Sequence, residues 1–187
     1  MSATHNPGGR SKLTVDPSVI STATFSECGR YRQTLIRCWD TLLPTIVFVG
    51  MNPSVADTVV DDPTCAKERR WARLWGYGTY VKLNVMDYRA TNPKHLLQPD
   101  LVVQTHSNLA CMAEHISQAV LVIAAWGCIH PKLRCHQHRV LQLLAQSGAT
   151  VQCMGINLDG SPRHPLYLKS NTTPQEFDLK SGTQHES

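Results

Sequence analysis

The feature that most constrains the fold is a series of short apolar runs, each of which ends in a loop and is followed by a helical stretch. Residues 45–49 read TIVFV and stop at Gly50, and residues 119–125 read AVLVIAA. Continuous apolar runs of this length are typical of strands that are buried on both faces of a parallel sheet. Further strands are predicted at residues 80–85 and 150–154. Strands that alternate with helices favour an open α/β sheet.

The segments between these runs have the periodicity of helices. The predicted helices cover residues 63–75, about 105–117 and about 131–145. A β-hairpin is predicted before them, at residues 22–26 and 31–39. We therefore expect a single α/β domain over residues 21–170. Residues 1–20 and 171–187 have little apolar periodicity and are predicted to be flexible tails.

Composition limits the classes of function. A chain of 187 residues, 42% of them hydrophobic, fits one globular domain with a core large enough to hold a pocket. The net charge of +4 permits a phosphate-bearing partner without requiring one. The seven cysteines are scattered without CxxC spacing, so neither a disulfide framework nor a metal site is expected. No stretch approaches the roughly 20 apolar residues of a membrane span, and no secretory signal is present, so we expect a cytoplasmic protein.

The first of three loops with unusual residues follows the first apolar run. Ligands of open α/β sheets bind outside the carboxyl ends of the strands, which is where this loop lies. Gly50 lets the backbone approach a ligand closely, and Asn52 offers a fixed amide that can orient a water or a substrate group. Asp57 can act as a base, as can Asp61 or Asp62. The alternative is an Asx turn in which Asp62 caps the following helix.

The second loop follows the strand predicted at residues 80–85. Asn84 lies at the end of that strand, where its amide can read the edge of a base by donating and accepting at once. Arg89 can hold a phosphate or a carboxylate. The alternative is a hydrogen-bonded loop in which Asn84 and Asn92 satisfy backbone groups.

The third loop lies near the C-terminus, at residues 163–168, which read RHPLYL. His164 stands between Arg163 and Pro165 and is not expected in a regular element. It is interpreted either as a site residue or as a solvated surface histidine. Trp126, which follows the strongest predicted strand, is interpreted as core or as the wall of a pocket.

The helix predicted at residues 63–75 interleaves basic and aromatic side chains. The basic residues are Lys67, Arg69, Arg70 and Arg73, and the aromatic residues are Trp71 and Trp75. Such a pattern can follow a phosphate backbone and stack on bases. The alternative is an amphipathic helix with its tryptophans in the core and a solvated basic face.

Taken in order, the three loops resemble the motifs of the uracil-DNA glycosylase superfamily. The resemblance is carried by GMNPS at residues 50–54, by Asn84 at a strand end, by VLVIAAWG at residues 120–127 and by His164-Pro165. The segments FSECGRYR, GMNPSVAD, DDPT, WGYG and PRHPLYL, taken together, resemble domain-of-unknown-function family 1643.

The superfamily resemblance implies a three-layer α/β/α fold and cleavage of an N-glycosidic bond without a cofactor. It implies that Asn52, with Asp57 as a helper, positions water, and that His164 stabilises the departing base. The substrate-binding residues it implies are Gly50, Met51, Pro53, Ser54, Asn84, Arg89, Trp126 and Arg163. The nucleic-acid contacts are Lys67 and Arg70, together with Leu168 in the position of an intercalating wedge. The implied partner is DNA or a nucleotide.

Departures from the superfamily pattern keep three hypotheses open. The closing motif reads His-Pro-Leu-Tyr-Leu in place of the small residues that grip DNA, and the first motif lacks a strong base. The leading hypothesis is a glycosylase that acts on a modified or damaged base in DNA. The second is a non-catalytic binder of nucleic acid or nucleotide. The third is a hydrolase of a free nucleoside.

Overall fold

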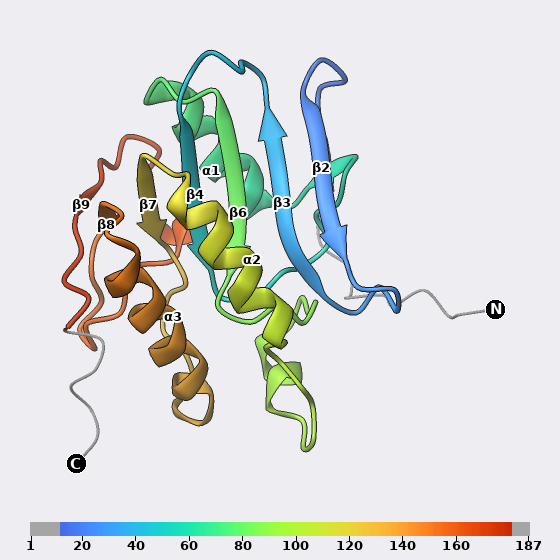
Figure 1. Cartoon of the computed structure of the whole chain (residues 1–187), viewed down its shortest axis with the longest axis vertical. Helices are drawn as coiled ribbons and strands as arrows, with labels where there is room; N and C mark the ends of the chain where they lie inside the picture. Colours follow the sequence, from blue (N-terminus) through green and yellow to red (C-terminus); the bar gives the residue numbers. More distant parts are fainter. Residues whose placement is uncertain (1–11, 181–187) are drawn as a thin grey trace.

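The computed structural model describes residues 12–180 and contains one large mixed sheet with helices on both faces (Figure 1). The strands of this sheet are β2 (Ile20–Phe25), β3 (Arg32–Cys38), β4 (Thr45–Gly50), β6 (Thr79–Asn84), β7 (Leu121–Ala124), β8 (Val151–Cys153) and β9 (Gln175–Glu176). They lie in the order β2-β3-β6-β4-β7-β8-β9. The four central strands β6, β4, β7 and β8 are parallel, and the outer pairs are antiparallel. The expected α/β architecture, with a parallel centre and an N-terminal hairpin, is confirmed.

Helices cover both faces of the sheet because its central strands are apolar on both faces. Helix α1 (Pro63–Leu74) lies on one face, and α2 (His106–Ser117) and α3 (Arg134–Ser147) lie on the other (Figure 1). Alternate residues of β4 belong to the apolar clusters on opposite faces of the sheet. Ile46 and Phe48 belong to the apolar cluster that includes Trp71 of α1. Val47 and Val49 belong to the cluster that includes residues of α2 and α3.

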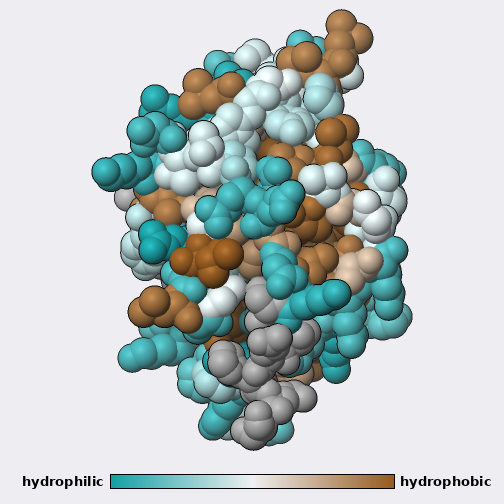
Figure 2. Space-filling model, turned by 90° about the vertical axis from the view of Figure 1, so that its left-hand side faces the viewer, coloured by the Kyte–Doolittle hydropathy of each residue, from teal (hydrophilic) through white to brown (hydrophobic). Residues whose placement is uncertain are grey.

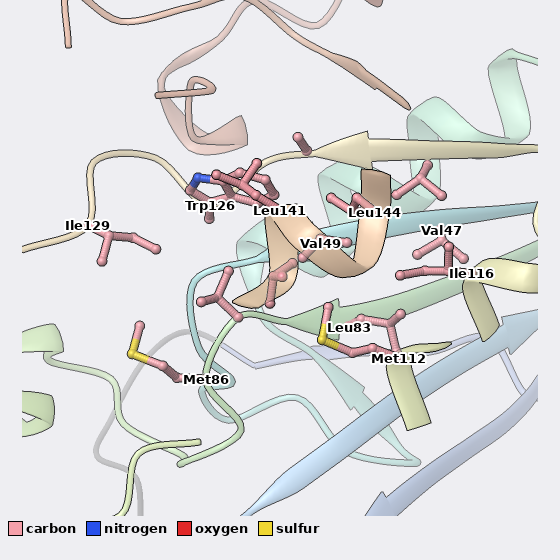
Figure 3. Close-up of a cluster of buried hydrophobic side chains, with 14 of the residues drawn as sticks. Val47, Val49, Leu83, Met86, Met112, Ile116, Trp126, Ile129, Leu141 and Leu144 are labelled. Atoms are coloured by element: carbon pink, nitrogen blue, oxygen red, sulfur yellow. The ribbon is translucent and has the colours of Figure 1, made fainter. Parts of the chain in front are cut away.

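The cluster beneath α2 and α3 is the larger of the two. Figure 3 shows it with strand residues Val47, Val49 and Leu83, α2 residues Met112 and Ile116, and α3 residues Leu141 and Leu144. Each of these side chains is at most 2% exposed. Full burial of an aliphatic side chain contributes about 1.5–3 kcal/mol. The burial of these apolar side chains therefore holds α2 and α3 on the sheet.

The ends of the helices follow from local signals in the sequence. Asp62 caps α1 by accepting a hydrogen bond from the Cys65 N–H at 2.9 Å. Thr105 caps α2 in the same way. Helix α3 follows a 3-10 turn at Pro131–Leu133 and stops at Gly148, whose φ of 67° suits a glycine. The three predicted helices are confirmed, with boundaries that differ by no more than three residues.

Two short strands lie outside the range 21–170 expected for the domain. β1 (Leu13–Thr14) pairs with β5 (Val60–Asp61), and β9 pairs with β8. Phe177, which follows β9, is 6% exposed and meets the ring of Trp126 edge-on at 5.7 Å between centroids. The fold therefore includes part of both predicted tails. Residues 1–11 and 181–187, the remainder of those tails, lie outside the described residues.

The C-terminal strand forms one edge of the sheet. Seen from this edge, the surface mixes hydrophilic side chains with separate apolar patches (Figure 2). β9 has only two residues, both polar and exposed. Short polar edge strands discourage pairing with other chains. Within residues 12–180, every helix is too short or too polar to form a membrane span.

Replacement of Phe177 tests whether the C-terminal strand belongs to the core. Phe177→Ala removes a buried ring that packs on Trp126, so we expect a loss of about 3 kcal/mol in the free energy of unfolding. Urea denaturation followed by circular dichroism measures this loss. Glu176→Ala, at the neighbouring exposed position, is the control and should change stability by less than about 0.5 kcal/mol. Equal stability of the two variants would contradict the packing described for Phe177.

Candidate functional site

A cavity of about 510 Å³ opens at the carboxyl ends of the central strands. Strand β4 leads to α1 on one face, whereas β7 leads to α3 on the other, so the chain leaves these neighbouring strands in opposite directions. Ligands of open α/β sheets bind at such switch points. Of the residues predicted from the sequence, those that line the cavity are Gly50, Met51, Asn52, Ser54, Asp62, Asn84, Trp126, Arg163 and His164.

Asn84 provides the strongest sign of a binding site. It is 1% exposed, and neither polar atom of its side-chain amide has a hydrogen-bond partner within residues 12–180. Buried side-chain amides almost always have partners, because an unpaired one costs about 1–3 kcal/mol. The alternative in which this side chain satisfies the loop backbone is therefore not observed. Asn92, by contrast, accepts a hydrogen bond from the Lys94 N–H and caps a short 3-10 helix.

Asn52 joins the first loop to the second. Its amide N–H groups donate to the carbonyl oxygens of Ala90 at 2.7 Å and of Pro53 at 3.0 Å. These contacts fix the plane of the amide. The acceptor oxygen of Asn52 makes no hydrogen bond to the part of the chain that the structure describes. This oxygen is therefore available to a ligand or a water.

The three acidic residues near the first loop have different roles. Asp57 accepts hydrogen bonds from two backbone N–H groups of the following turn, at 2.8 and 3.0 Å, and does not line the cavity. Asp61 is fully buried between Arg37 and Arg69, at 2.9 Å from each. Asp62 caps α1 and also lines the cavity. Of these three carboxylates, only that of Asp62 lines the cavity.

The third loop closes over the end of β7. His164 is half-buried, and its Cβ lies 3.2 Å from the position that a Cβ on Gly127 would occupy. Its Nδ1 accepts a long hydrogen bond, 3.4 Å, from the Leu166 N–H. Arg163 and Tyr167 are exposed where they line the cavity. These residues form the mouth of the cavity.

The floor of the cavity holds a buried ion pair that the sequence analysis missed. Lys82, 4% exposed, lines the cavity, and its Nζ donates to Glu68 Oε1 at 2.7 Å. The Tyr80 hydroxyl donates to the other Glu68 oxygen at 2.7 Å. Burial raises the pKa of Glu68, although the Lys82 ammonium opposes the shift. The signal in the sequence is the spacing of Lys82, two positions before Asn84 in the same strand. Residues two apart in a strand lie on the same face of the sheet, so both side chains point to the cavity side.

Arg32 and Cys65 also line the cavity and were not predicted from the sequence. Arg32, at the start of β3, is 1% exposed and lines the cavity beside the end of β6. Cys65, in the first turn of α1, also lines the cavity. Burial raises the pKa of the Cys65 thiol far above its usual range, which favours the neutral thiol over the thiolate.

Several predicted residues lie outside the cavity. They are Pro53, Asp57, Lys67, Arg70, Arg89 and Leu168. Arg89 donates to the Gly29 carbonyl at 2.9 Å and covers the ring of Phe25, so it secures the hairpin turn. Lys67 donates to the Leu168 carbonyl. Leu168 itself is half-buried against the α1 cluster, and the projecting side chain of this loop is Tyr167, 87% exposed.

Helix α1 follows the amphipathic alternative. Trp71 is 1% exposed, and its ring stacks on that of Trp75 at 6.0 Å between centroids. Arg69 is held by Asp61, and Arg70 is exposed. The tryptophans therefore contribute to the core and are not stacking platforms for bases. Within residues 12–180, no cluster of three or more His, Cys, Asp or Glu side chains could hold a metal ion.

The mixed sheet, its flanking helices and the cavity at the carboxyl ends of the central strands define a mixed α/β protein. The chain belongs to the family described as protein of unknown function (DUF1643), whose model matches residues 30–166. That range contains every cavity-lining residue named above except Tyr167. Comparison with curated proteins and with solved structures finds no match.

The pH dependence of stability tests the buried pair. A raised pKa of Glu68 means that the folded state binds this proton more readily than the unfolded state. The stability that protonated Glu68 adds is therefore present at low pH and is lost as the pH rises through the folded-state pKa. We expect the wild type to lose stability relative to Glu68→Gln as the pH rises from the ordinary glutamate pKa through the raised folded-state pKa, by about 1.4 kcal/mol per unit of pKa difference.

Urea denaturation at a series of pH values measures this difference. Glu114→Gln, which changes an exposed glutamate of α2, is the control and should follow the wild type. A constant difference between the wild type and Glu68→Gln across the pH range would contradict the raised pKa.

Proposed function

We propose that the protein hydrolyses the N-glycosidic bond of a modified or damaged nucleobase in DNA. The observation that carries this proposal is the buried amide of Asn84, which lines the cavity without a partner for its donor or its acceptor. A base edge offers neighbouring acceptor and donor groups, which such an amide pairs with simultaneously. The order of the GMNPS, Asn84 and His164-Pro165 motifs, which resembles the uracil-DNA glycosylase superfamily, supports the same function.

The size and walls of the cavity suit a base that has left the DNA stack. Ligand pockets commonly enclose about 300–1,000 Å³, and the cavity here encloses about 510 Å³. Trp126 lines it, and the indole N–H of that residue has no partner within the described residues. A flipped base therefore meets the indole of Trp126, with its unpaired N–H, and the unpaired amide of Asn84.

Water is held by the acceptor oxygen of Asn52 and by the carboxylate of Asp62. Both residues line the cavity, and both are fixed by hydrogen bonds to the backbone. Asp62 takes a proton from the water as it adds to the sugar, and its negative charge stabilises the positive charge that develops there. His164 at the mouth stabilises the negative charge on the departing base.

A non-catalytic binder of nucleotides or nucleic acid is the second candidate. The observation that favours it is the amide of Asn52, whose N–H groups are both used to hold loops together. A purely structural role for this amide would leave the cavity able to bind a base without hydrolysing its bond. The two candidates differ in whether base is released.

Base release from oligonucleotides tests the proposed function. The substrates carry uracil, hydroxymethyluracil, hypoxanthine or alkylated bases, in single and double strands, and mass spectrometry detects the released base. We expect release by the wild type and a loss of about 100-fold or more in Asn52→Ala and His164→Ala. Asn92→Ala, which alters an asparagine outside the cavity, is the control. Salt-sensitive binding without any release would favour the non-catalytic binder.

The two roles of Asp62 can be separated by two substitutions. Asn caps helices as well as Asp does, so Asp62→Asn should keep stability within about 0.5 kcal/mol of the wild type. Asp62→Ala removes the cap and should cost about 1 kcal/mol. Both should lose base release, because neither provides a base. Thermal unfolding and the release assay measure the two effects, and full activity in Asp62→Asn would exclude its role as a base.

A further inference from the structure

Two buried arginines of strand β3 have opposite environments. Arg37 is 0% exposed, and its guanidinium bonds Asp61 at 2.9 and 3.2 Å and also donates to backbone carbonyl oxygens. Arg32 is 1% exposed and makes a single side-chain hydrogen bond, from Nη1 to the Ala56 carbonyl at 2.7 Å. The ion pairs within the described residues involve Arg37, Arg69 and Lys82, and none involves Arg32.

The unsatisfied part of Arg32 is one edge of its guanidinium. The Nε is buried and has no partner within residues 12–180. Nη1 is the nitrogen that bonds Ala56, so the edge formed by Nε and Nη2 is unused. This edge is one of those through which arginine binds a carboxylate or a phosphate with two parallel hydrogen bonds.

A buried guanidinium without a carboxylate carries a large desolvation penalty. Arg32 lines the cavity, and an anionic ligand there would supply the missing charge. The Asp62 carboxylate also lines the cavity, but it lies beyond ion-pair distance from Arg32. Charge balance thus favours a ligand that brings its own negative group.

The position of Arg32 places this group close to the base-reading amide. Strands β3 and β6 are antiparallel, so the start of β3 lies beside the end of β6, where Asn84 is. The backbone N–H of Arg32 donates to the Asp87 carbonyl in the loop that follows Asn84. A ligand whose base edge meets Asn84 can therefore reach Arg32 with a group attached to the base or to its sugar.

Taking the ligand to be a nucleobase or nucleotide, as the proposed function does, we propose that Arg32 forms an anion subsite inside the cavity. The subsite binds a group with two anionic oxygens, either a carboxylate on the base or the phosphate of the nucleotide. Neutral, unmodified bases and nucleosides leave the guanidinium unpaired and bind more weakly. The cavity thus selects for charge as well as for the base edge.

Two pairs of probes test the subsite and separate the two sources of the anion. One pair is uracil and 5-carboxyuracil, and the other is deoxyuridine and deoxyuridine 5′-monophosphate. Isothermal titration calorimetry gives the dissociation constant of each for the wild type, Arg32→Met, Arg32→Lys and Arg139→Met. Arg139 is an exposed arginine of α3 outside the cavity and serves as the control. Arg32→Lys keeps the charge but loses the two-pronged geometry.

We expect the anionic member of at least one pair to bind the wild type and Arg139→Met at least about 10-fold more tightly than its neutral counterpart. Arg32→Met should lose this advantage, and Arg32→Lys should lose most of it. An advantage in the first pair alone assigns the anion to the base, and one in the second pair alone assigns it to the phosphate. No advantage in either pair, no binding of any probe, or an advantage that survives in Arg32→Met overturns the proposal.

The test does not depend on hydrolysis. Uracil and 5-carboxyuracil contain no glycosidic bond, so their binding reports on the subsite alone. An anion preference without base release would contradict the proposed hydrolysis but support the anion subsite. Base release without an anion preference would contradict the anion subsite but support the proposed hydrolysis.

Discussion

The double-sided burial of β4 is the constraint on which the rest of the structure depends. Four consecutive residues, Ile46 to Val49, are 0% exposed, and they alternate between the two faces of the sheet. Neither face can meet water, so helices must cover both. The connection that follows β4 therefore runs to one face, and the connection that follows the neighbouring β7 runs to the other. The separation of these two connections opens the cavity. The burial of β4 on both faces therefore determines both the packing of the core and the position of the cavity.

The floor of the cavity holds the buried polar side chains of Lys82 and Asn84, which lie on one face of β6. A Cβ on Gly50 would lie 2.5 Å from Lys82 Nζ and 3.0 Å from Asn84 Oδ1, so a glycine here leaves room for both side chains in their observed positions. The ammonium of Lys82 is neutralised by Glu68, which lies beneath it on α1. The amide of Asn84 has no such partner. Of the buried side-chain atoms without a partner within residues 12–180, those of Arg32, Asn84 and Trp126 belong to residues that line the cavity. Unpaired groups are expected at functional sites, where the fold gives up some stability for binding.

The main strands and helices could be predicted from the sequence because the signals for them are local. Apolar runs located β4 and β7, and Pro63 with its neighbouring Asp62 located the start of α1. The two-residue strands β1, β5 and β9 have no periodicity to detect, and they form because of partners distant in the chain. The buried charges could not be predicted for the same reason, because their partners are also distant in the chain. Glu68 stands among basic residues of an apparently solvated helix, and only the packing of α1 on β6 brings it to Lys82.

Arg37 shows that this fold can satisfy a buried guanidinium, whereas Arg32 has no ion pair within residues 12–180. Both lie on β3, and Asp61, which neutralises Arg37, is followed directly by Asp62, which lines the same cavity as Arg32. A carboxylate therefore lies in the cavity, yet it caps α1 and does not pair with Arg32. A buried charge left open beside an available acid costs stability without strengthening the core. Its position beside Asn84, whose amide is also unpaired, makes a single charged ligand the simplest partner for both.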